Sequence, residues 1–257
     1  MPVIDVSHQL LAILCGSLVG ASLALIGGGG SILAVPLLLY VVGVRDAHLA
    51  IGTSTLAVSL NAFANLVPHA RAGHVRWREA AVFAVAGVLG AAIGSGLGKW
   101  LDGQRLLVLF AALMLVVAAL MWRPRTADAV PRAHPLPWLG GTGLCAGGLA
   151  GFFGIGGGFL IVPGLMFAGG FSVIEAVGSA LLAVGLFGAT TAASYAASGL
   201  IDWRVAAEFV AGGLAGGWLG ALGAHRLARR RGALNRLLTV MIAAVAVYML
   251  WREAGRL

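Results

Sequence analysis

Charged side chains are scarce in this sequence. Only 10% of the 257 residues are Asp, Glu, Lys or Arg, whereas 60% are hydrophobic. A soluble domain carries about 25% charged residues, because water must wet its outer surface. The composition therefore excludes an ordinary soluble protein and indicates a chain embedded in a lipid bilayer. The net charge of +8 is then no sign of a nucleic-acid partner, and we expect none.

The residue patterns of common enzymes are also missing. No Gly-x4-Gly-Lys-Ser/Thr motif is present, so the chain is not expected to hydrolyse ATP. The apolar segments hold no nucleophile beside a base and no His/carboxylate cluster, which argues against an intramembrane enzyme or a metal site. Cys15 and Cys145 lack metal-ligand spacing and are expected to serve packing. We therefore expect no enzymatic activity, no cofactor and no metal.

Long continuous apolar runs are abundant. Membrane β-barrels have alternating segments of about 10 residues, whereas a spanning helix needs about 20 apolar residues in succession. The sequence therefore predicts an all-α integral membrane protein with five helical segments in each half. The predicted segments are 7–26, 31–43, 48–68, 79–100 and 104–122, and then 137–154, 158–169, 173–198, 203–225 and 234–251.

The two halves resemble each other. A shift of 127 residues superposes Pro36 on Pro163, each of which follows a glycine run, and a shift of 126 superposes Trp77-Arg78 on Trp203-Arg204. Such ordered matches indicate a duplication. We expect a first repeat over 1–123, a second over 137–257, and a proline-rich linker over 124–136, all within one transport unit.

The distribution of basic residues predicts the orientation. Eleven of the 17 Lys and Arg lie in 69–78, 123–136 and 226–236, which fall on one side if the segments alternate. Basic loops favour the cytoplasm, so both termini are expected outside, and the odd number of segments makes the repeats inverted. If only the short second segment of each half is re-entrant, this bias disappears.

The short second segment of each half is the strongest pointer to a transport site. It follows Gly27–Gly30 in the first half and Gly154–Gly158 in the second, and neither glycine run is suited to a regular helix. Broken or re-entrant helices at matching places of two repeats commonly hold the substrate near the middle of the membrane.

The paired motifs resemble a known family. Gly28-Gly29-Gly30-Ser31 with Pro36, then His48 to Ser54, then Gly73 and Trp77-Arg78 are similar to the sulfite exporter TauE/SafE family of bacterial membrane proteins. The resemblance covers essentially the whole chain and implies secondary transport of sulfite or a small organosulfonate. The halves also differ, because Ile155 replaces Gly28 and Gly158 replaces Ser31.

Backbone amides are the natural anion ligands in this chain. The start of a helix exposes about four N–H groups and carries roughly half a positive charge, and glycine lets an anion approach these groups closely. The alternative is that the glycines only permit tight helix crossing. The candidate residues of this kind are Gly28, Gly29, Gly30, Ser31, Gly156, Gly157 and Gly158.

Polar side chains inside the third segment of each half form the second set of candidates. A polar group in hydrocarbon must find a partner, so these residues face protein or a water-filled path. They either contact the substrate or form interhelical hydrogen bonds. The set comprises Thr53, Ser54, Asn61, Asn65, Ser179, Thr190, Thr191, Ser194 and Tyr195.

These observations together favour a secondary transporter in the bacterial inner membrane that carries a small sulfur-containing anion, with export as the expected direction. A passive anion channel, or a carrier of another small anion, is the alternative. No acidic relay lies within the spans, so proton coupling is left open, with His48 and His69 as candidates. Whether the protein forms a homodimer is also left open.

Overall fold

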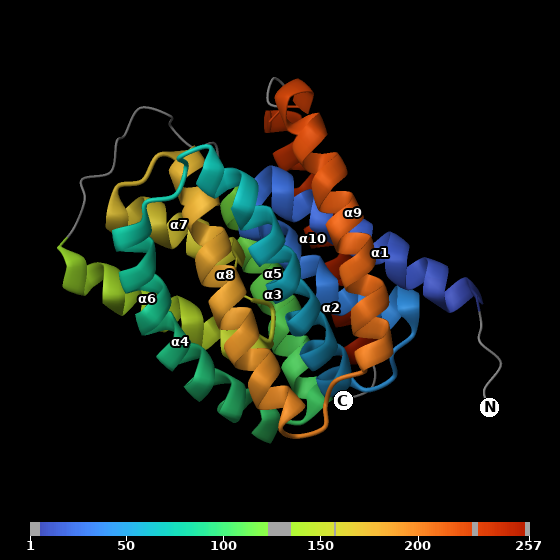
Figure 1. The fold of residues 1–257 in the computed structure, drawn as a ribbon. Helices are drawn as coiled ribbons and strands as arrows, with labels where there is room; N and C mark the ends of the chain where they lie inside the picture. Colours follow the sequence, from blue (N-terminus) through green and yellow to red (C-terminus); the bar gives the residue numbers. More distant parts are fainter. Residues whose placement is uncertain (1–5, 123–134, 157, 228–230, 255–257) are drawn as a thin grey trace.

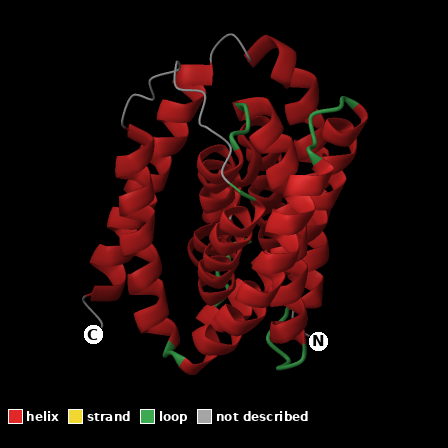
Figure 2. Ribbon diagram, turned by 90° about the vertical axis from the view of Figure 1, so that its left-hand side faces the viewer, coloured by secondary structure: helices red, strands yellow, loops and turns green. Residues whose placement is uncertain are grey.

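The computed structural model describes residues 6–122, 135–156, 158–227 and 231–254, and this part of the chain contains helices and loops but no strand (Figure 2). Along the described ranges, ten α-helices and two short irregular helical segments follow one another (Figure 1). The α-helices are α1 (Val6–Ile26), α2 (Ala34–Leu37), α3 (Ala47–Arg71), α4 (Trp77–Trp100), α5 (Gly103–Trp122), α6 (Leu136–Phe153), α7 (Gly158–Gly169), α8 (Val173–Ala196), α9 (Trp203–Leu227) and α10 (Arg231–Ala254).

The all-α prediction is confirmed, and most helix ends lie within a few residues of the expected positions. Within the described ranges, four helical stretches are long and apolar enough to cross a membrane: His8–Leu25, Ala47–Arg71, Trp77–Trp100 and Val173–Ala196. Shorter apolar helices cover Gly30–Val42, Gly103–Ala119 and Leu160–Gly169. The expected linker lies almost wholly outside the described residues, which resume at Pro135.

The expected loop 226–236 is largely helical. Helix α9 continues to Leu227 and α10 begins at Arg231, so only 228–230 fall outside the described helices. The sequence interpretation failed here because clustered arginines were read as a loop, although Arg has a high helix propensity.

The second segment of the first half is longer and less regular than expected. The helix was predicted to begin near Ser31, but a 3-10 turn η1 (Gly27–Leu33) already follows α1 directly. It continues through α2 into a π-helical turn η2 (Leu38–Val42), which ends at Gly43 with φ of +86°. Because glycine tolerates the tighter 3-10 geometry, the glycine run distorts the helix there without interrupting it.

Tight glycine contacts define two helix pairs. Helix α1 packs along α9, where a Cβ added to Gly20 would lie 2.0 Å from the Gly213 carbonyl oxygen. Helix α4 packs along α6 in the same way. A Cβ added to Gly147 would lie 2.0 Å from the Gly87 carbonyl oxygen. No larger residue fits at these positions, so the many glycines allow the close helix packing on which membrane bundles depend.

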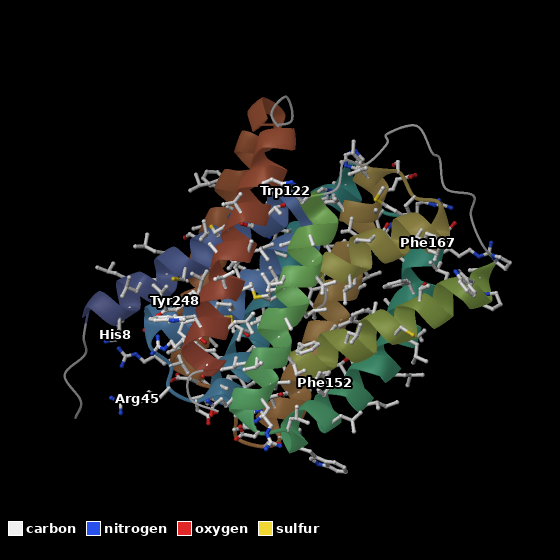
Figure 3. All side chains as sticks on the ribbon, turned by 180° about the vertical axis from the view of Figure 1, so that it is seen from behind. His8, Arg45, Trp122, Phe152, Phe167 and Tyr248 are labelled. Atoms are coloured by element: carbon white, nitrogen blue, oxygen red, sulfur yellow. The ribbon has the colours of Figure 1, made fainter. Side chains whose placement is uncertain are left out.

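Helices α3 and α8 pack against each other in the interior. Ser59 of α3 donates a hydrogen bond of 2.7 Å to the Gly185 carbonyl of α8, while Gly188 faces the carbonyl of Thr55. Contacts move back along α3 as they advance along α8, so the two helices are antiparallel. Helices α5 and α10 form a further pair on one face of the bundle, as Figure 3 shows from behind.

Candidate functional site

The first glycine motif, Gly27–Ser31, lies in the η1 turn, and the second, Gly154–Gly158, ends at the first residue of α7. The η1 turn packs against α7 and α8, so segments more than 120 residues apart in sequence are brought together. Gly30, Ser31, Gly154 and Gly156 are all buried. The structure thus places η1 beside the helix that follows the second motif, whereas Gly157 lies outside the described residues.

The second motif interrupts the chain sharply. Helix α6 ends at Phe153, and both Gly154 and Gly156 have φ of +63°. Only glycine adopts this left-handed conformation without strain. Helix α7 then begins at Gly158, so the second half contains the expected helix start. The two motifs thus differ, with a sharp break in the second half and a continuous 3-10 turn in the first.

Thr55 of α3 holds the second motif in place. Its hydroxyl lies 2.5 Å from the Gly154 carbonyl oxygen and 2.6 Å from the Ile51 carbonyl oxygen of its own helix. The set of site residues chosen from the sequence does not include Thr55 or Ser59. Their spacing of four residues, which places both on one helix face, was the available signal.

Thr53 and Ser179 have similar structural roles in the two halves. The Thr53 hydroxyl accepts a hydrogen bond of 3.0 Å from the backbone N–H of Asp202. The Ser179 hydroxyl accepts one of 3.1 Å from the backbone N–H of Arg76. Both side chains are fully buried, so each holds a loop against a helix. Ser54 donates to the Ile51 carbonyl at 3.0 Å, which uses its hydroxyl within its own helix.

Asn61 and Asn65 face α9. A Cβ added to Gly213 would lie 1.9 Å from the Asn61 amide nitrogen, and one added to Gly217 would lie 2.8 Å from Asn65 Oδ1. Asn65 donates a hydrogen bond of 2.8 Å to the Asn61 carbonyl, whereas neither side-chain amide atom of Asn61 has a hydrogen-bond partner among the described residues. Asn61 is fully buried, so its unpaired amide carries a desolvation cost that a bound ligand would relieve.

The polar residues late in α8 divide into two kinds. Thr190 donates to the Leu186 carbonyl of its own helix at 2.8 Å. The hydroxyls of Thr191 and Tyr195 are buried and have no partner within the described chain. The Ser194 carbonyl accepts a hydrogen bond of 3.0 Å from Lys99 Nζ, which also lies 5.8 Å from the Tyr195 ring centre. The sequence interpretation did not connect Lys99 with this group.

The tryptophans are exposed on the surface of the bundle. Trp218 lies inside a predicted span. Its side chain is 67% exposed and points away from the interior, since the neighbouring glycines occupy the packed face of α9. The six tryptophans at segment ends are exposed, as expected for aromatic residues at the membrane surface: Trp77, Trp100, Trp122, Trp138, Trp203 and Trp251.

Comparisons with known proteins show the family of this chain. The family model for sulfite exporter TauE/SafE matches residues 12–249. The chain belongs to this family. A protein of Xylella fastidiosa (strain Temecula1), named a probable membrane transporter protein, is 52% identical over 96% of this chain and 97% of its own.

More distant relatives carry similar names. Probable membrane transporter protein YunE of Bacillus subtilis is 26% identical over 82% of this chain and 87% of its own. A probable membrane transporter protein of Haemophilus influenzae is 30% identical over 74% of each chain. No solved structure matches the chain. Family membership and the long apolar helices together make this a multi-pass membrane protein.

Proposed function

We propose that this TauE/SafE family member is a secondary transporter of a small sulfur-containing anion, either sulfite or an organosulfonate such as sulfoacetate. The family description and the names of the relatives favour transport over enzymatic catalysis. The substrate class comes from the family, and the site comes from the chemistry of the buried glycine motifs. The transporter would work by alternating access in the bacterial inner membrane, with export as the direction.

The observation that carries this proposal is the packing of η1, which contains the first glycine motif, against the helix that follows the second motif. The η1 turn packs on α7, and the second motif has two left-handed glycines directly before a helix start. Free N–H groups at a helix start attract an anion, and the glycines leave room for it. The candidate binding set remains Gly28, Gly29, Gly30, Ser31, Gly156, Gly157 and Gly158.

Alternating access would use two inverted repeats. Gly16 faces Phe209 across α1 and α9, and Gly143 faces Phe83 across α4 and α6; a shift of 127 relates the glycines and one of 126 relates the phenylalanines. The Ser59–Gly185 hydrogen bond joins residues 126 apart, as expected near a pseudo-twofold axis. The antiparallel packing of α3 on α8 is what inversion requires of equivalent helices.

Flux into proteoliposomes tests the function directly. Purified protein in vesicles should show saturable uptake of sulfite or sulfoacetate, and preloaded anion on the other side should accelerate it by exchange. A panel with sulfate and thiosulfate defines the substrate class. Flux without saturation or exchange would indicate the alternative, a passive anion channel. Saturable flux restricted to anions without sulfur would indicate a carrier of another small anion, and no flux of any anion would refute the proposal.

A further inference from the structure

A polar pocket opens at the end of the bundle where α3 and α5 begin and α10 ends. Its volume is about 720 Å³, and its lining includes Arg45, His48, Gln104 and Arg252. Figure 3 shows Arg45 toward this end of the molecule and Trp122 toward the other. None of these four residues belongs to the glycine motifs, so the pocket is a second polar feature of the molecule.

The acidic residues around the pocket are engaged in local structure. Asp46 accepts a hydrogen bond of 2.7 Å from the Leu49 N–H and thereby caps α3. Asp102 accepts bonds from the N–H groups of Gln104 and Arg105 at the start of α5. Glu253 accepts a bond of 2.9 Å from the Tyr40 hydroxyl. These contacts offset part of the negative charge with helix termini and a hydroxyl donor.

Neither arginine of the pocket caps a helix, whereas two of its acidic residues do. Arg45 is exposed, and its side chain forms no hydrogen bond or ion pair with the described residues. Arg252 donates a hydrogen bond of 3.0 Å to the Tyr248 hydroxyl, and its guanidinium lies 4.9 Å from the centre of the Tyr40 ring. Aromatic rings fix the position of Arg252 while leaving its charge in place. Three carboxylates (Asp46, Asp102 and Glu253) and two arginines line the pocket, so its formal charge is −1 and positive charge is offered to an anion locally, at the exposed Arg45 and at Arg252.

His48 connects the pocket with the interior. Its Nε2 donates to the Leu101 carbonyl at 3.1 Å, because a carbonyl can only accept, and its buried Nδ1 has no partner in the described chain. The His48 ring centre lies 6.2 Å from that of Tyr195 on α8. The pocket thus ends at the outer end of the α3–α8 interface.

Unpaired polar atoms continue inward along this interface. Tyr195 and Thr191 are four residues apart on α8 and present buried hydroxyls without partners. Three residues further, Gly188 faces Thr55, whose hydroxyl contacts the Gly154 carbonyl. Each unpaired buried hydroxyl costs free energy unless a ligand or water binds it, so a polar path along α8 accounts for both.

We propose that the pocket is an anion-binding vestibule of the transport route, and that the α3–α8 interface leads from it past His48 and Tyr195 to the second glycine motif. The proposal rests on the transport function proposed above. Its ligand is the dissolved substrate oxyanion, drawn in by Arg45 and Arg252. An anionic lipid headgroup has the same charge chemistry and is distinguished by the experiment.

The test compares Arg45→Gln and Arg45→Glu with Arg105→Gln. Arg105 is an exposed arginine at the same end that does not line the pocket, which makes it a matched control. Radiolabelled sulfite or sulfoacetate uptake is measured in phosphatidylcholine vesicles at low ionic strength. We expect the KM to rise about threefold to tenfold in Arg45→Gln and further in Arg45→Glu, while the maximal rate of both variants stays unchanged. The KM of Arg105→Gln should equal that of the wild type.

Salt provides the second measurement. At 1 M salt the Debye length falls to about 3 Å, so the wild type and the Arg45 variants should converge in KM. Equal KM values for the wild type, Arg45→Gln and Arg105→Gln at low salt would overturn the vestibule while leaving the transport function intact. An Arg45 effect found only in vesicles with phosphatidylglycerol would assign the pocket to lipid. A wild type that transports no anion would refute both proposals.

Discussion

Asn61 lies where a membrane protein rarely tolerates such a side chain. Its amide is fully buried against the glycine face of α9, and neither amide atom has a partner among the described residues. An unsatisfied buried polar group costs about 1–3 kcal/mol. A residue that weakens the fold in this way is expected to serve a ligand, which is the reason to test it first.

Asn61→Leu distinguishes an amide that binds the substrate from one that is only a buried polar group of the fold. Leucine has a similar size and no unpaired polar atoms, so we expect the free energy of unfolding to rise by about 1 kcal/mol and the thermal midpoint to rise with it. Anion transport should fall at least tenfold. Asn65→Leu serves as the control, because it removes a hydrogen bond of 2.8 Å and should not raise stability. Full transport in stabilised Asn61→Leu would show that this amide does not contact the substrate.

Other buried hydroxyls show why residue type alone does not identify a site. Thr53, Ser179 and Thr191 share polarity, full burial and position in the third segments. The first two accept hydrogen bonds from loop N–H groups, and only Thr191 is without a partner in the described chain. The sequence placed all three in one set because the loops that fold back onto Thr53 and Ser179 cannot be recognised from hydropathy.

At the scale of elements, glycine positions determine how closely the helices approach. Along α6, Gly147 lies against the Gly87 carbonyl of α4, whereas Gly141 has no other atoms near its added Cβ. The same helix therefore has a packed glycine and an unconstrained one. The packed positions on α1, α4, α6 and α9 belong to the two helix pairs that flank the interior.

Gly147→Leu should disrupt the α4–α6 pair. Its Cβ would lie 2.0 Å from the Gly87 carbonyl oxygen, so the helices must separate, at a cost of about 1–3 kcal/mol or more. The thermal midpoint in detergent should fall, while Gly141→Leu should leave it nearly unchanged. Equal midpoints for the two variants would contradict the close packing of these helices.

The boundaries of the elements could be predicted well because hydropathy and glycine or proline positions control them. The expected segment 158–169 and the observed α7 have the same limits. The first glycine run was the exception, since its 3-10 turn depends on support from α1 and α7 that a local pattern does not contain. The break at Gly154 and Gly156 was easier to anticipate because it requires positive φ.

At the scale of the whole molecule, the pairing of α1 with α9 and of α4 with α6 interleaves the two halves of the chain. The expected repeats over 1–123 and 137–257 are therefore not separate bodies in space. A site between the two glycine motifs needs this interleaving, because each half contributes one motif.

Orientation can be tested with single cysteines. In a Cys145→Ser background, an impermeant maleimide should label Arg45→Cys in intact cells and label Arg71→Cys only after permeabilisation. Both positions are exposed at opposite ends of α3, and basic loops favour the cytoplasm for the Arg71 end. Cys15 is buried and should remain unlabelled. Labelling of Arg71→Cys alone in intact cells would reverse the orientation and place the pocket inside.

The sequence by itself determined that this chain is a bundle of membrane helices with a glycine run before a short helix in each half, because the cost of exposing polar groups to lipid leaves few alternatives. It also provided the family through motifs that recur in both halves. Only the tertiary structure decided which buried polar groups are already paired and which are free, since Thr55, Thr53 and Ser179 find their partners in distant segments. Hydrogen bonds depend on atomic distances and directions, and these exist only once the helices have packed.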